Sequence, residues 1–96
     1  HYPAHIERDM GCTEVEWLRA LPAAMGEVPW QRSDTSVRAT LGQGSLDIHW
    51  REGAPRVIAL MRMPRLHVTF DFQGVDEPAR QVFMKRFDLY MQRGGG

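Results

Sequence analysis

The 96-residue sequence has one cysteine, one lysine and no long apolar run. Cys12 cannot form a disulfide within the chain, and a metal site built on cysteines alone is excluded. The longest apolar stretch, residues 57–61, is far shorter than the roughly 20 residues that cross a bilayer. The N-terminus lacks the basic-then-apolar pattern of a secretory signal. We therefore expect a cytoplasmic protein with no membrane partner.

Net charge and catalytic motifs are also missing. Twelve basic and twelve acidic residues cancel, whereas a nucleic-acid-binding domain carries a strong basic excess. The sequence has no phosphate-binding glycine loop and no nucleophile elbow. Gly42-Gln43-Gly44 lacks the following helix and the third glycine of a dinucleotide-binding loop. We expect no cofactor and no nucleic-acid partner.

The residues that are present suit a small globular domain. Apolar residues make up 43% of the chain and charged residues 25%, which is ordinary for a folded domain and wrong for disorder. A chain of this length forms one domain, residues 1–96. Residues 1–11 fit either a short edge strand or a flexible arm, and residues 94–96 are expected to fray.

Two helices are predicted, one near each end of the chain. Thr13 and Glu16 form a capping box, so the first helix starts there. Pro22 should end or kink this helix near Leu21, and Gly26 should stop its last turn. Asp76 is the N-cap of the second helix. The expected buried stripe of the second helix contains Ala79, Val82, Phe83, Phe87 and Tyr90.

Between the helices, apolar residues alternate with polar ones. Residues 36–41, 46–51 and 66–72 have the period of half-buried strands. Residues 56–63 are apolar at both parities, which predicts a central strand covered on both faces. Pro64 fits a turn before the last strand or a bulge in one long strand. The chain is thus predicted to be an α+β two-layer sandwich, α-β-β-β-β-α. It has a four-stranded antiparallel meander with both helices packed on one face.

The sheet face opposite the helices is the candidate site. It would present polar side chains together with the apolar residues of the third strand, and its candidate binding residues are Arg38, His49, Ile58, Leu60, His67 and Asp71. Half-exposed antiparallel sheets commonly have such a polar, solvated face. The apolar residues of the third strand still need a cover, for which the N-terminal arm, a second subunit and a ligand remain open. Our leading hypothesis is a non-enzymatic interaction module that uses this face for a protein partner or for self-association.

The alternative hypothesis is a small enzyme or a metal- or ligand-binding protein that uses His49, His67 and Asp71. Imidazole nitrogen and carboxylate oxygen suit zinc or iron. No local ligand spacing supports a metal site, and an open sheet face offers no cleft that would exclude water from a catalytic pair. Cys12 precedes the first helix, where a thiol pKa can fall; a hydrophobic contact before the cap is the alternative.

Two segments resemble a small family of uncharacterised bacterial proteins with no assigned activity. These segments are "ERDMGCTEVEW", residues 7–17, and "RFDLYMQRGGG", residues 86–96. The resemblance carries no catalytic motif and implies no activity. The helix–sheet–helix order is also similar to that of frataxin-like domains, but the first helix here lacks their acidic character, so only the topology is implied.

Overall fold

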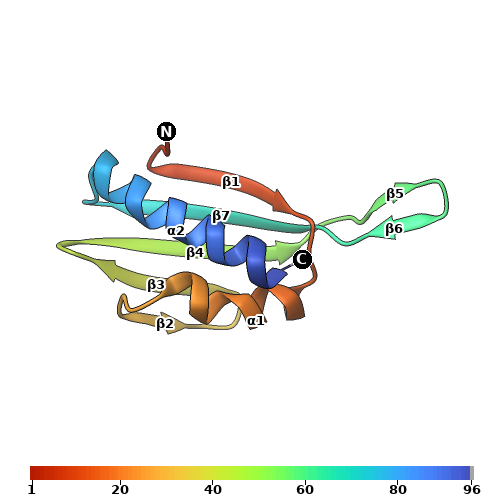
Figure 1. Cartoon of the computed structure of the whole chain (residues 1–96), viewed down its shortest axis with the longest axis horizontal. Coiled ribbons are helices and arrows are strands. Elements are labelled where there is room, and N and C mark those ends of the chain that lie inside the picture. The colour runs from red at the N-terminus through yellow and green to blue at the C-terminus, as the bar shows by residue number, and fades with distance from the viewer. Residues whose placement is uncertain (96) are drawn as a thin grey trace.

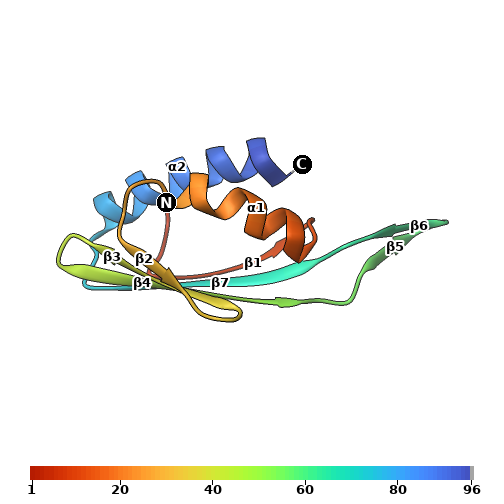
Figure 2. The same ribbon diagram turned by 90° about the horizontal axis from the view of Figure 1, so that it is seen from below.

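The computed structural model describes residues 1–95 and has two layers, a sheet and a pair of helices (Figure 1). The elements follow in this order: β1 (His5–Met10), α1 (Glu14–Met25), β2 (Trp30–Arg32), β3 (Ser36–Leu41), β4 (Gly44–Glu52), β5 (Arg56–Ile58), β6 (Met61–Met63), β7 (Leu66–Gln73) and α2 (Glu77–Gly95). Both helices lie on the same face of the sheet (Figure 2), so the predicted α+β class and the placement of the helices are confirmed.

The sheet has five strands rather than the expected four, in the order β1-β7-β4-β3-β2. Residues 5–10 pair antiparallel with β7, so the N-terminal segment is an edge strand and the flexible-arm alternative is wrong. Residues 30–32 pair with β3 and form the opposite edge. The edge strand near the N-terminus was one of the two alternatives for residues 1–11 and is confirmed. The strand at residues 30–32 was not predicted, because three residues carry little periodic signal.

The prediction of a central strand over residues 56–63 is wrong. These residues form a separate two-stranded hairpin, β5 and β6, which we call the arm. The arm projects beyond one end of the sheet (Figure 1) and gives the molecule its long axis of 47 Å, against 24 and 22 Å for the other two. Pro64 and Arg65 lie outside both strands and separate β6 from β7. Residues 56–63 were expected to form the third strand, next to β4. That place in the sheet is taken by β7, which pairs directly with β4.

Helix α1 begins as its sequence predicts. The Thr13 hydroxyl accepts a hydrogen bond from the Glu16 backbone, and the Glu16 side chain accepts one from Thr13 N–H. The helix continues through Pro22 to Met25 before Gly26 ends it, so Pro22 does not stop it near Leu21. In α2, Asp76 accepts a hydrogen bond from Ala79 N–H, as an N-cap does. The predicted frayed tail is helical to Gly95, and Gly96 lies outside the described residues.

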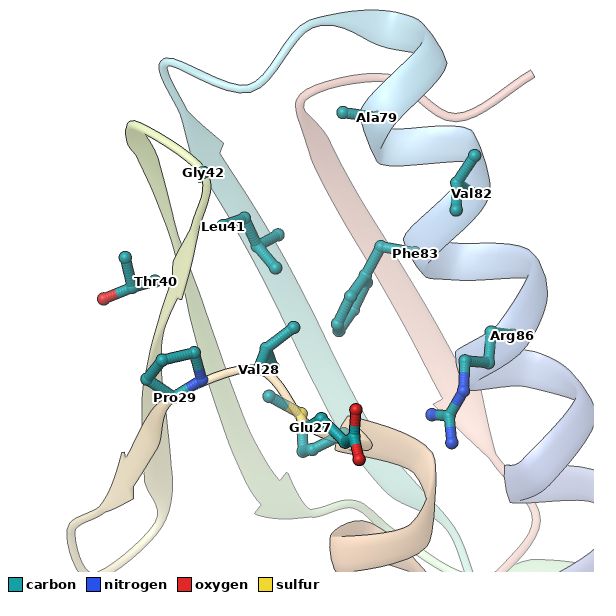
Figure 3. Close-up of a pocket in the computed structure, with 11 residues that line it drawn as sticks. Glu27, Val28, Pro29, Thr40, Leu41, Gly42, Ala79, Val82, Phe83 and Arg86 are labelled. Atoms are coloured by element: carbon teal, nitrogen blue, oxygen red, sulfur yellow. The ribbon is translucent and has the colours of Figure 1, made fainter.

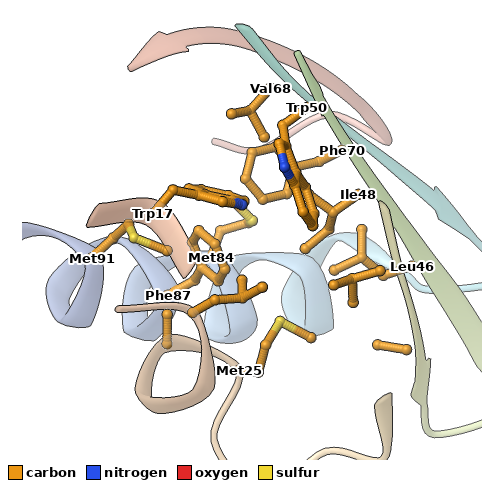
Figure 4. Packing of buried hydrophobic residues seen from close by; sticks show 14 of the residues in the cluster. Trp17, Met25, Leu46, Ile48, Trp50, Val68, Phe70, Met84, Phe87 and Met91 are labelled. Atoms are coloured by element: carbon orange, nitrogen blue, oxygen red, sulfur yellow. The ribbon is translucent and has the colours of Figure 1, made fainter. Parts of the chain in front are cut away.

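One apolar core fills the space between the layers (Figure 4). Trp17 packs at its centre, with its ring centroid 5.5 Å from Trp50 and 5.9 Å from Phe87. The buried stripe of α2 is offset from the predicted one. Met84, Phe87 and Met91 are buried, whereas the expected Val82 is 73% exposed. The fully buried large side chains are Trp17, Leu21, Met25, Leu46, Ile48, Leu66, Phe70, Met84 and Phe87.

Candidate functional site

The arm is a tight hairpin that extends the β4–β7 pair. At this end of the main sheet, the last backbone hydrogen bond runs from Gly53 N–H to Arg65 O, at 2.9 Å. Beyond this point, Arg56 pairs with Met63, Val57 with Arg62, and Ile58 with Met61. Ala59 forms part of the turn with a φ of 53°, an unusual value for a residue other than glycine.

The apolar side chains of the arm are exposed to solvent. Directly paired residues share a face of a hairpin, so Ile58, Met61 and Met63 lie on one face. Leu60 at the turn is 103% exposed, which is the highest value among the large apolar side chains of the described residues. The other exposed fractions are 62% for Val57, 49% for Ile58, 65% for Met61 and 41% for Met63.

Such an arm is unusual for an isolated domain. A two-stranded hairpin is marginally stable in water without further packing, and each strand here has three residues. Soluble monomers rarely expose apolar side chains in one contiguous group without a binding role. The arm is therefore a candidate binding surface.

The predicted site residues fall into two separate groups. Arg38, His49, His67 and Asp71 lie on the sheet face away from the helices, as expected from their parity in β3, β4 and β7. Ile58 and Leu60 lie on the arm, outside the five-stranded sheet. The expectation that these apolar residues share a surface with His49 and His67 is wrong because residues 56–63 do not enter the sheet.

Charged side chains on the open sheet face join β1 to β7. His5 Nδ1 lies 2.5 Å from Asp71 Oδ1, and its Nε2 lies 3.1 Å from Glu7 Oε2. His67 lies 3.1 Å from Asp9 and 3.3 Å from Glu7. Arg65 contacts Asp9 at 3.2 Å. Because β1 residues supply one side of nearly every contact, this cluster holds an edge strand in place.

These contacts shift the pKa values of three members of the cluster. Hydrogen bonds to Asp71 and Glu7 raise the pKa of His5. The hydrogen bond with His5 lowers the pKa of Glu7, and the hydrogen bond with His67 lowers the pKa of Asp9. His5 thus favours its charged form, and the two carboxyl groups favour theirs. Within the described residues, no group of three or more potential ligands is arranged to hold a metal ion.

The cluster predicts the pH range over which His5 stabilises the fold. A raised His5 pKa stabilises the fold below about pH 6.5, and this contribution disappears as the pH rises through the folded-state value. The lowered pKa values of Glu7 and Asp9 stabilise the fold above about pH 4 and are lost as the pH falls through them. The urea midpoints of wild type and His5→Gln should therefore differ most between about pH 4 and 6.5, and they should converge as the pH rises through the raised folded-state pKa of His5. A difference that stays constant from pH 5 to 9 would contradict this role.

Cys12 does not have the properties of a reactive thiol. It is buried beside the core, 6% exposed, and burial raises the pKa of its thiol. A nucleophilic cysteine needs a lowered pKa and access to solvent. The structure therefore supports the hydrophobic contact before the helix cap rather than an activated thiol.

An apolar groove lies at the end of the molecule opposite the arm (Figure 3). Its volume is about 890 Å³. Phe83 from α2 and Leu41 from β3 point into it, and Val28 lies between them (Figure 3). Arg86 at its wall donates hydrogen bonds to the carbonyls of Ala23 and Ala24 at the end of α1. The groove could not be predicted from the sequence because three separate segments, residues 25–29, 40–42 and 79–86, form its walls.

Comparisons with family models, with curated proteins and with solved structures find no match to this chain. Within the described residues, neither helix combines the length and the apolarity needed to cross a membrane.

Proposed function

We propose that this protein is a small non-enzymatic binding module that contacts another protein through its β5–β6 arm. The observation that carries the proposal is the exposure of Val57, Ile58, Leu60, Met61 and Met63 on one projecting hairpin. Burying apolar surface is the main favourable term in protein association. Methionine adapts its shape to a partner surface better than branched side chains do, and the arm has two methionines.

The arm is dispensable for the fold, which suits a binding element. Its strands pair with each other and leave the ladder between β4 and β7 complete from Ser45 to Glu52. The fully buried large side chains all lie outside residues 56–63. Contact with a partner can therefore be gained or lost without disturbing the core.

A variant without the arm should keep the fold. Residues 54–64 would be replaced by Asn-Gly, which forms a two-residue hairpin turn between the already paired Gly53 and Arg65. The shorter connection lowers the entropy cost of closing the loop, so the free energy of unfolding should be equal to that of wild type or up to about 1 kcal/mol higher. Urea denaturation checks this. A loss of several kcal/mol would mean that the arm belongs to the core structure.

The binding role itself is tested by site-specific crosslinking. A photoreactive amino acid would replace Leu60 in cells that produce the protein, and the matched control would carry it in place of His49 on the open sheet face. We expect position 60 to crosslink to a protein and position 49 to give no specific product. If position 60 also gives no protein adduct, the proposed function is wrong. A specific adduct at position 49 alone would assign the interaction to the sheet face instead.

A further inference from the structure

The arm and the apolar groove have complementary character and lie at opposite ends of the molecule (Figures 1 and 3). The arm presents Ile58, Met61 and Met63 on one face and Leu60 at its tip. The groove is open and is lined mainly by apolar side chains, and Val82 is 73% exposed at this site. The arm also bends toward the side of the sheet that carries the helices (Figure 2). The groove lies between α2, the segment that follows α1, and β3.

On the basis of the proposed function, we propose that the arm's partner is a second copy of this chain, and that each arm lies in the groove of the other copy. Two copies related by a two-fold axis and placed antiparallel bring the arm end of each beside the groove end of the other. One symmetry operation therefore makes both contacts at once. Such a closed, isologous arrangement is the commonest form of soluble homo-oligomer.

The area of the contact favours this reciprocal arrangement. Full burial of one large apolar side chain removes roughly 60–120 Å² from water, so the four apolar side chains on this face and at the tip of one arm remove on the order of 240–480 Å². A stable interface needs about 800 Å² from each partner. An arm that docks alone falls short of this value. In the two-fold pair each chain contributes both its arm and its groove, which about doubles the buried area.

The charges of the two surfaces are also complementary. The arm carries Arg56 and Arg62 and no acidic residue. Glu27 and Arg86 line the groove, but Arg86 donates hydrogen bonds to the carbonyls of Ala23 and Ala24 at the end of α1. Asp76 and Glu77 lie at the start of α2, before the groove residue Ala79. Opposite charges at the rim of an interface set its register and speed association. The Arg residues of the arm would thus lie beside these acidic groups while the apolar tip occupies the groove.

The test is a mixing experiment on the purified 96-residue chain by sedimentation velocity. Leu60→Glu alters the arm and Val82→Lys alters the groove. Both positions are exposed, so circular dichroism should show both variants folded. Each variant alone should have a dimer dissociation constant about 30-fold or more above that of wild type, as for a central interface residue. His49→Glu is the matched control on the open sheet face, and its dissociation constant should be unchanged.

An equimolar mixture of the two variants should form a heterodimer at concentrations where each alone is monomeric. That heterodimer keeps one unaltered arm–groove contact, between the Val82→Lys chain's arm and the Leu60→Glu chain's groove. Its second contact places Glu against Lys. No recovery on mixing, or a dimer that Val82→Lys leaves intact, would contradict the arm–groove contact. A dimer disrupted only by His49→Glu would place the interface on the sheet face.

Failure of this inference can be told apart from failure of the proposed function. A wild type that stays monomeric at millimolar concentration, with a crosslink from position 60 to a different protein, overturns the second copy as partner and keeps the binding role. A monomer with no crosslinked protein overturns both. Co-sedimentation of the monomer with anionic phospholipid vesicles, lost in Leu60→Glu, would assign the arm to a lipid surface and also overturn both.

Discussion

Replacing Phe87 by alanine is expected to lower the free energy of unfolding by about 3–5 kcal/mol. Phe87 is fully buried, and its ring centroid lies 5.2 Å from Phe70, 5.8 Å from Phe83 and 5.9 Å from Trp17. The truncation removes a side chain that joins α2, α1 and the sheet, and leaves a cavity between them. The whole domain has roughly 5–14 kcal/mol of stability for its length, so this loss is a large fraction.

Lys85→Ala is the control on the same helix. Lys85 is exposed and lies outside the groove, and surface substitutions usually change stability by less than about 0.5 kcal/mol. Urea denaturation of both variants measures the orientation of α2 about its own axis. Similar losses for the two variants would mean that α2 presents a different face to the sheet.

Replacing Asp88 by alanine is expected to lower the free energy of unfolding by about 1–3 kcal/mol. This is less than the 3–5 kcal/mol for breaking a fully buried ion pair, because its side chain and that of Arg8 are about one quarter exposed and solvent screens them. Asp88 on α2 accepts two hydrogen bonds from Arg8 on β1, one of them at 3.0 Å. Tyr2 donates a third at 3.1 Å. Asp88→Ala would leave the Arg8 guanidinium partly buried over the Phe70 ring without its carboxylate.

The control for this pair is Asp47→Ala on the open sheet face. Asp47 contacts Arg38 at 3.2 Å, but the Arg38 side chain is 68% exposed. An exposed pair of this kind contributes about 0–1 kcal/mol. Thermal unfolding should therefore distinguish the two variants, with a clearly lower midpoint for Asp88→Ala. Equal midpoints would mean that the Arg8–Asp88 contact does not anchor α2 to β1.

Local signals in the sequence were enough to predict the α+β class and the two helices, but not the strand order. The capping box at Thr13 and Glu16 marks the start of α1 because its hydrogen bonds involve residues three apart. Polar and apolar residues alternate strictly in residues 66–72. Because side chains of a strand point alternately to its two sides, this pattern predicts which side of β7 is buried. These two facts predict helices on one face of an antiparallel sheet.

The inward orientation of Arg8 and Asp88 could not be predicted in the same way. The two residues are 80 positions apart, and a charged residue in either element normally indicates a solvent-facing position. The buried face of α2 was also predicted incorrectly. Apolar residues occur on more than one side of this helix, so spacing alone could not favour Met84 and Met91 over Ala79 and Val82 as its buried residues.

The prediction that residues 56–63 form a sheet strand is wrong because their apolar pattern does not specify what covers them. A run that is apolar at both parities indicates that both faces are covered, and a central strand satisfies that requirement within one domain. A partner molecule satisfies it equally well and leaves no trace in the sequence of the chain. Pro55 and Pro64, which bracket the run, were a usable signal, since proline interrupts pairing with the main sheet.

Hydrogen–deuterium exchange of residues 57–63 at increasing protein concentration tests the central claim most directly. If the arm lies in the groove of a second copy, the exchange of its backbone amides should slow as the protein dimerises. The amides of Glu27 and Val28 in the groove should slow over the same concentration range, and those of β1 should not change. Fast arm exchange that does not depend on concentration, from micromolar to millimolar protein, would contradict the account.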